Sequence, residues 1–202
     1  DASNVSIVPG GTSTSGTAMQ ASTGGIINIT GGDITLSNIN GSLVASDAGS
    51  AIHLDGVQVN AARNGRLRAS NAGLLTVRDS QIAFAPGGSL AGFAVEGTGG
   101  RVEVYDSQVD GGWFDVGGGN SSLLLQNVTA NSVGGSLRVM GNTTTSTYAT
   151  ADIEGGSFST VGGYGDNINN WGSVSARNAA FDVRDGFAGF WLSSDESRLQ
   201  LT

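Results

Sequence analysis

The stretch Leu75-Thr76-Val77-Arg78-Asp79-Ser80-Gln81-Ile82 contains the pattern from which the fold of this chain is predicted. Two apolar residues alternate with polar ones, a turn-forming residue follows, and another apolar residue comes three positions later. The same pattern recurs as Val102-Glu103-Val104-Tyr105-Asp106-Ser107-Gln108-Val109. Alternation with period two indicates a β-strand with one buried face, and Asp79 or Asp106 marks a sharp bend between two such strands.

This pattern returns about every 25 residues. When the second apolar residue of each first strand is taken as the reference, the successive spacings are 25, 23, 27, 21, 28, 23 and 25 residues. The reference residues are Ile29, Leu54, Val77, Val104, Leu125, Ile153, Ala176 and Leu201. A further apolar column follows five residues later, at Ile34, Val59, Ile82, Val109, Ala130, Phe158 and Phe181. A period of this length predicts stacked repeats that share one core.

A column of turn residues stands two positions after each reference residue. Its members are Gly31, Gly56, Asp79, Asp106, Asn127, Gly155 and Asn178. Gly, Asn and Asp are the residue types that adopt a positive φ at low cost, so we expect a left-handed backbone conformation at each of these corners.

A third apolar-alternating stretch follows later in most repeats. It is formed by the pairs Leu43 and Ala45, Leu67 and Ala69, Phe93 and Val95, Phe114 and Val116, Leu137 and Val139, and Phe190 and Leu192. We therefore predict an all-β fold, a parallel β-solenoid of about eight coils of roughly 25 residues with three short strands per coil. At about 4.8 Å per coil, eight coils make a rod on the order of 35–40 Å long.

The domain organisation follows from where the repeat begins. Residues 25–202 form the predicted β-solenoid, and residues 1–24 are a Ser/Thr/Gly-rich N-terminal segment or an irregular first coil. Val5 and Ile7 are candidates for the first strand of an earlier coil, with Ile7 22 residues before Ile29. The sequence stops as the strand at Leu201 closes, so we expect an excerpt of a longer solenoid or a molecule that polymerises through exposed strand edges.

Composition argues against several classes of function. The net charge of −8 opposes binding to nucleic acid or to an anionic membrane surface, and no apolar run is long enough to span a bilayer. The chain has no cysteine, which removes disulfides and thiol chemistry. His53 lies between two inward residues and should face solvent. We expect no metal site and no cofactor.

The carboxylate pairs and one glycine-rich stretch are candidates for catalytic or metal sites. Glu103 and Asp152 share an outward column but lie two coils apart, and Asp182 with Asp185 flanks Arg184, so no pair is favoured for acid–base chemistry. The stretch Gly162-Gly163-Tyr164-Gly165-Asp166-Asn167 partly matches a calcium-binding nonapeptide, with Asp one position early and in a single copy. Neither pattern predicts a site.

Aromatic residues are the best candidates for contacts with a glycan or a protein partner. Trp171 and Tyr164 lie on the longest irregular insertion, and Trp113 and Trp191 adjoin inward positions of the third strand. Exposed Trp and Tyr rings stack on the apolar faces of sugars. The alternative is that these four rings cover a corner or an end of the fold.

The repeated pattern of Leu75 to Ile82 and Val102 to Val109, with its Gly-rich corners, resembles the right-handed parallel β-helix passenger domains of bacterial autotransporters of the pertactin type. The resemblance covers residues 24 to 202 and is one of architecture, which pectin-degrading enzymes and phage tailspikes share. It implies a right-handed β-helix that is displayed on the bacterial surface, and it implies no specific receptor.

Three functions follow as hypotheses. The first is a non-enzymatic, secreted or cell-surface β-solenoid that acts as an adhesin stalk or extracellular structural element. The second is a subunit that stacks head to tail, through the solenoid ends, into an extracellular filament. The third is a polysaccharide lyase or hydrolase of the β-helix type.

Overall fold

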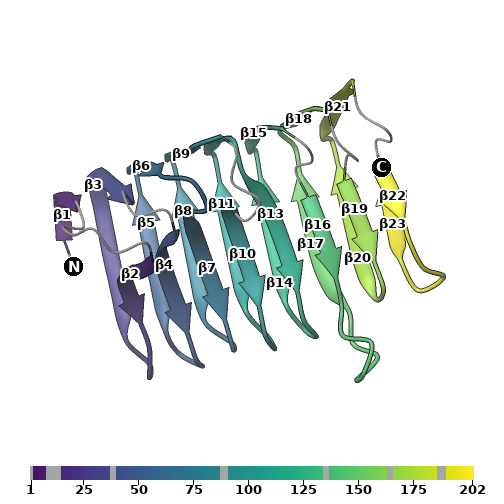
Figure 1. The fold of residues 1–202 in the computed structure, drawn as a ribbon, viewed down its shortest axis with the longest axis horizontal. Helices are drawn as coiled ribbons and strands as arrows, with labels where there is room; N and C mark the ends of the chain where they lie inside the picture. Colours follow the sequence, from purple (N-terminus) through teal and green to yellow (C-terminus); the bar gives the residue numbers. More distant parts are fainter. Residues whose placement is uncertain are drawn as a thin grey trace.

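The structure, a computed structural model, describes residues 2–7, 15–36, 40–86, 91–133, 137–162, 166–185 and 190–202. In these residues the regular secondary structure is entirely β, without a helix. The strands stack in parallel into a β-solenoid of about seven turns (Figure 1). The prediction of a parallel β-solenoid is confirmed, and the observed number of turns is close to the predicted eight coils.

Each coil contributes one strand to each of three ladders, which we number by their order in the repeat. The first ladder begins with the N-terminal half of β3 (Ile26–Leu36). It continues through β5 (Ala51–Asp55), β8 (Leu74–Arg78), β11 (Arg101–Tyr105), β14 (Ser122–Gln126), β17 (Ala149–Glu154), β20 (Gly172–Arg177) and β23 (Arg198–Leu201).

The second ladder follows the bend after the first and begins with the C-terminal half of β3. Because β3 runs through both ladders, they form one sheet of 15 strands. The remaining strands are β6 (Gln58–Ala61), β9 (Gln81–Phe84), β12 (Gln108–Asp110), β15 (Thr129–Val133), β18 (Ser157–Val161) and β21 (Ala180–Arg184). They lie along the upper edge of the molecule in Figure 1.

The third ladder is a separate sheet of eight strands. It consists of β2 (Ser15–Ala21), β4 (Asn40–Ser46), β7 (Arg66–Ser70), β10 (Gly92–Glu96), β13 (Trp113–Gly117), β16 (Leu137–Met140), β19 (Asp166–Asn169) and β22 (Phe190–Leu192). Corners along the lower edge in Figure 1 return the chain from this ladder to the first.

The register of the first ladder is the one that the repeat predicts. Ile29 pairs with Leu54, Leu54 with Val77, and Val77 with Val104. The same column continues through Leu125, Ile153, Ala176 and Leu201. The apolar column of the second ladder, from Ile34 to Phe181, is likewise in register at every step. Residues some two dozen positions apart in sequence therefore stack directly on one another.

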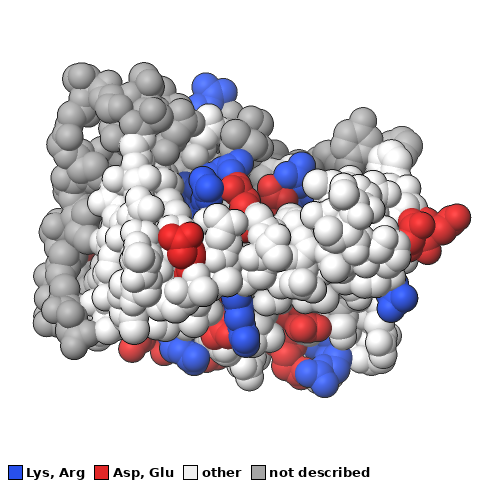
Figure 2. All heavy atoms as spheres, turned by 90° about the horizontal axis from the view of Figure 1, so that it is seen from below, with Lys and Arg blue, Asp and Glu red and all other residues white. Residues whose placement is uncertain are grey.

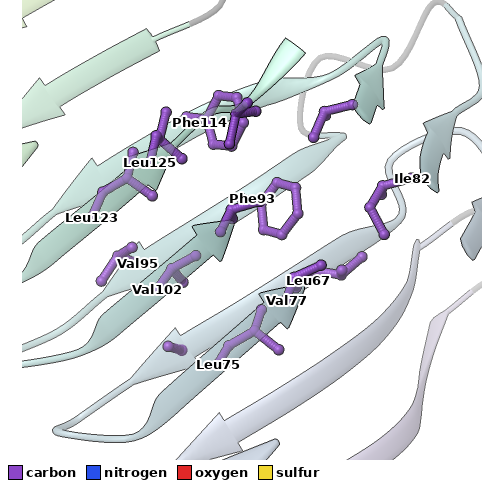
Figure 3. Close-up of a cluster of buried hydrophobic side chains, with 14 of the residues drawn as sticks. Leu67, Leu75, Val77, Ile82, Phe93, Val95, Val102, Phe114, Leu123 and Leu125 are labelled. Atoms are coloured by element: carbon purple, nitrogen blue, oxygen red, sulfur yellow. The ribbon is translucent and has the colours of Figure 1, made fainter. Parts of the chain in front are cut away.

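Inward side chains of the three ladders form one continuous core. The close-up in Figure 3 shows Leu75 and Val77 of the first ladder, Ile82 of the second and Phe93 of the third turned toward one another. Phe93 stacks on Phe114 of the next coil, with ring centroids 5.2 Å apart and an angle of 8° between the rings. Burial of these columns supplies the main stabilisation, because a single coil has no partner for its apolar face.

The seven turn-column residues all have a positive φ. The values are 67° at Gly31, 60° at Gly56, 47° at Asp79 and Asp106, 53° at Asn127, 66° at Gly155 and 52° at Asn178. A left-handed residue at each corner turns the chain from the first ladder into the second at the same place in every coil.

Serine hydroxyls join neighbouring coils next to these corners. Ser80 is 2% exposed, and its hydroxyl accepts a hydrogen bond of 3.1 Å from the backbone N–H of Val57 in the preceding coil. The same hydroxyl donates to the carbonyl of Arg78 at 2.5 Å. Ser107 repeats this arrangement one coil later, since its hydroxyl accepts from the N–H of Ser80 at 3.1 Å.

The two ends of the fold depart from the predicted pattern. β1 (Ala2–Ile7) pairs with β3 so that Ile7 lies beside Ile34 and Ala2 beside Ile29. The expected alignment of Ile7 with Ile29 is therefore wrong. β1 runs beside both halves of β3, and the spacing of a coil alone does not fix where along them a short strand pairs. Leu192 pairs with Ile168 as expected but is 45% exposed, since β22 is the last strand of its ladder.

Candidate functional site

The outer face of the third ladder carries the densest group of charged side chains next to a pocket. Alternation along the strands turns Leu67, Phe93 and Phe114 inward, so the residues beside them face out. One outward column therefore runs through Arg68, Ala94, Asp115, Arg138, Asn167 and Trp191. A neighbouring column contains Arg66, Gly92 and Trp113.

A surface pocket of about 410 Å³, including its open mouth, lies on this face. Its lining includes Arg66, Ala91, Ala94, Trp113, Asp115 and Arg138. Ala91 and Ala94 are each 2% exposed and form the floor. The pocket exists because small side chains stand in the outward columns between longer neighbours. The cavity volume that can be compared with ligand sites is about 80 Å³, well below the roughly 300–1,000 Å³ typical of small-molecule sites, so the pocket can receive one face of a ligand but cannot enclose it.

Arg138 and Asp115 form a bidentate ion pair on one wall of the pocket. The Nε of Arg138 donates to Oδ1 of Asp115 at 2.8 Å, and its Nη2 donates to Oδ2 at 2.5 Å. This hydrogen bonding raises the pKa of Arg138 above its ordinary value, against the opposing effect of partial burial. The guanidinium is therefore held in one orientation and stays charged.

Glu96 forms ion pairs with two arginines beside the pocket. Its carboxylate lies 2.5 Å from Nη1 of Arg66 and 3.0 Å from Nε of Arg68. Together with the pair of Arg138 and Asp115, the face holds three arginines and two carboxylates, which leaves one net positive charge. The chain as a whole carries −8, so this face differs in sign from the average surface.

Elsewhere, acidic and basic side chains also lie close to one another. In Figure 2 blue and red side chains neighbour each other at several places on the visible face. Arg177 lies 2.7 Å from Glu154, Arg101 lies 2.6 Å from Glu103, and Arg184 lies 2.5 Å from Asp182. The arginines of these pairs are 56–70% exposed, so each pair contributes little to stability.

Of the three predicted aromatic contact residues that the structure describes, one lines the pocket. Trp113 does so, at the start of β13. Trp191 is 41% exposed and shares the outward column of Asp115, but it lies three strands further along the ladder, about 14 Å away. Tyr164 lies outside the described residues.

Trp171 lies at a corner instead of at the pocket. Its ring meets Tyr148 edge-on, with centroids 5.1 Å apart, and Arg198 lies over the Tyr148 ring at 4.4 Å. Trp171 itself has a φ of 57°. This packing corresponds to the alternative in which an aromatic ring covers a corner.

Glu103, considered for catalysis, and Asp166, considered as part of a calcium motif, are held in other interactions. Glu103 pairs with Arg101 and accepts a hydrogen bond of 3.0 Å from the Tyr105 hydroxyl. Burial, followed by that bond, raises the pKa of Tyr105 above its ordinary value of 10.0. Asp166 is 2% exposed, and its Oδ1 accepts from the N–H of Leu137 at 2.9 Å. Asp166 thus serves the backbone of a neighbouring strand.

Across the described ranges, no group of three or more His, Asp or Glu side chains is arranged to hold a metal ion. A search of the same residues for a long apolar helix of membrane-spanning length finds none.

Sequence reasoning did not single out Arg66, Asp115 or Arg138. The signal was present, because Asp115 stands between the inward residues Phe114 and Val116, and Arg138 stands between Leu137 and Val139. Their spacing of 23 residues is one coil. Once the third ladder is placed in register, the two opposite charges must face each other on the outer surface.

In comparisons with known proteins, the chain matches no family model, no curated protein and no solved structure.

Proposed function

We propose that this protein is a non-enzymatic, secreted or cell-surface rod of the autotransporter passenger type, which acts as an adhesin stalk or extracellular structural element. The observation that carries the proposal is the unbroken register of the first ladder, from Ile29 to Leu201. A stack in which every coil is hydrogen-bonded to its neighbours is stiff along its axis, and stiffness is what a stalk requires.

Further features support a role outside the cell. The chain lacks cysteine and is acidic, so it has no thiol that would mispair in an oxidising compartment. The corner at residues 141–148 protrudes from the lower edge of the stack (Figure 1). Its tip is fixed by Asn142, whose Oδ1 accepts from the N–H groups of Thr144 and Thr145 at 2.9 and 3.1 Å. Such corners are what a rod would present to a partner.

Labelling of intact cells tests the location. Antibodies raised against this chain should label the surface of cells that produce it, and mild proteolysis of intact cells should remove the signal. An antibody against a cytoplasmic protein serves as the control and should label permeabilised cells only. If the chain is detected only after permeabilisation, the proposed location is wrong.

A second candidate function is head-to-tail stacking into a filament. The observation that favours it is the exposure of large apolar side chains on the last strands: Trp191 at 41%, Leu192 at 45% and Leu201 at 54%. β22 and β23 each pair on one side only within the described sheets. Strand edges of this kind are templates for further pairing.

A further inference from the structure

We propose that the pocket on the third ladder binds a saccharide that carries a carboxylate, namely a hexuronic acid unit, with its ring on Trp113 and its carboxylate on Arg138. The inference deepens the proposed function by naming a ligand for the displayed rod, and it rests on that function only for its biological setting. The binding of the saccharide is inferred from the residues that line the pocket and does not depend on the proposed function.

The pocket offers one aromatic ring beside a flat apolar floor. Trp113 forms a wall, and Ala91 and Ala94 lie beneath it with 2% exposure each. Gly92 lets β10 lie close to β13, because a Cβ at this position would collide with the backbone of Trp113. A pyranose ring has an apolar C–H face and a polar rim, so it can stack on the indole while its hydroxyls stay at the mouth.

Arg138 supplies a charged group that is already oriented. A guanidinium has five N–H donors, and Asp115 takes one from Nε and one from Nη2. Nη1 takes part in neither bond, and the side chain of Arg138 is 44% exposed. The Asp115 pair thus fixes the plane of the guanidinium, while Nη1 of this pocket-lining side chain is not used by Asp115. A preset fork of donors matches a carboxylate better than a neutral hydroxyl.

The net charge of this face also favours an anionic ligand over a neutral one. Three arginines against two carboxylates leave one net positive charge around the pocket. On a chain of net charge −8, a neutral ligand would gain nothing from this concentration of arginine, whereas an anionic ligand gains from it. A single carboxylate per ring balances the single excess charge.

Calorimetric titration of the purified chain with short oligosaccharides of a hexuronic acid tests the proposal. The neutral probes are the same oligosaccharides after reduction of their carboxyl groups to alcohols. The third probe is an oligosaccharide without carboxyl groups that carries sulfate esters instead. We expect the uronate to bind most tightly, the reduced form to bind at least about tenfold more weakly, and added salt to weaken the uronate complex.

Variants locate the binding site. Trp113→Ala and Arg138→Gln should each weaken uronate binding about tenfold or more, and Arg138→Lys, which keeps the charge without the fork, should lie between Arg138→Gln and the unaltered chain. Trp191→Ala, on the same outward face, and Arg101→Gln, which removes an arginine from an exposed ion pair on the first ladder, are the matched controls. Both controls should change the affinity less than about twofold.

Several outcomes would overturn the site. These are no binding of uronate, equal affinity for the reduced or sulfated probe, or unchanged affinity in both Trp113→Ala and Arg138→Gln while their circular dichroism shows an intact fold. Equal weakening by the control variants would overturn it as well. Cleavage of the oligosaccharide during the titration would contradict the non-enzymatic role while leaving the site in place. Intracellular location would likewise contradict the setting and leave the binding data unaffected.

Discussion

The hydroxyl of Ser80 holds two coils together at a point where the strand ladders are interrupted. It accepts from the N–H of Val57 in one coil and donates to the carbonyl of Arg78 in its own coil. Corners are the places where backbone groups lose their ladder partners, and a buried N–H without a partner costs free energy. The serine hydroxyl therefore supplies the hydrogen-bond acceptor that a neighbouring strand would otherwise provide at the corner.

Replacing Ser80 by alanine should destabilise the fold by about 1–3 kcal/mol, because the buried N–H of Val57 loses its acceptor. Chemical unfolding followed by circular dichroism measures the change. Ser157→Ala is the control, since Ser157 is exposed on β18, and it should change stability by less than about 0.5 kcal/mol. Equal unfolding midpoints for Ser80→Ala and the unaltered chain would show that the hydroxyl is not needed.

Substitution of two glycines with positive φ should change the stability of the fold by different amounts. Gly56 has a φ of 60° and nothing within 4 Å of the position of a Cβ, and Asn127 occupies the same corner in another coil. Gly56→Asn should therefore alter stability by less than about 0.5 kcal/mol. Gly118 has a φ of 90°, and a Cβ there would overlap the carbonyl of Gly97.

Gly118→Ala should consequently cost at least about 2 kcal/mol, from the left-handed backbone together with the overlap. Thermal unfolding of the two variants side by side is the measurement. A loss of stability in Gly56→Asn as large as that in Gly118→Ala would contradict the distinction between an open corner and a closed one.

At the scale of the strand, each element is stabilised by the strands that flank it in its ladder. β10 is five residues long and has no stability of its own, yet both of its faces are used. Phe93 stacks on Phe114 on the inside and meets Phe84 at 6.0 Å edge-on. On the outside, Ala94 leaves the space that becomes the pocket. One strand thus contributes both to the core and to the candidate site.

Phe93→Ala should lower stability by about 3–5 kcal/mol, because the ring is 1% exposed and its loss leaves a cavity between two neighbouring rings. Phe190→Ala is the comparison within the same ladder. Phe190 is only partly buried, in the last strand, and should cost clearly less. Urea unfolding midpoints of the two variants decide the order. The reverse order would mean that the core is not densest at the middle of the stack.

The strands and their register could be predicted from the sequence because the repeat aligns every coil with the next. The corner residues, such as Asp79 and Asn127, could be predicted for a local reason, since a positive φ restricts residue type wherever it occurs. The register of β1 could not be predicted, because one short strand without a preceding coil can pair at several positions along β3. The pocket could not either, since its depth depends on the absence of side-chain bulk at Ala94, and short outward residues leave no periodic signal.

At the scale of the whole molecule, the lateral surface and the last described strands differ in chemistry. Along the sides, apolar residues such as Met140, 39% exposed, occur singly. On the last strands, Trp191, Leu192 and Leu201 are exposed together beside open backbone edges. Apolar area and unpaired strands at one place favour association with another β-structure.

The purified chain should therefore associate as its concentration rises, and Leu192→Lys combined with Leu201→Lys should abolish the association by placing charges at the edge. Sedimentation velocity over a range of concentrations measures this. Met140→Lys, which adds a charge at an exposed apolar position in the middle of the stack, should leave the association unchanged. A chain that stays monomeric at every concentration would argue against head-to-tail stacking.

Each coil touches only the coil before it and the coil after it, and this has a consequence for how such genes diverge. A DNA segment that encodes one full circuit of the backbone can be duplicated or deleted, and the flanking circuits then meet across a junction that has the same geometry as before. Related genes should therefore differ in length by multiples of about 25 codons, while the corners between circuits accept short insertions independently of one another.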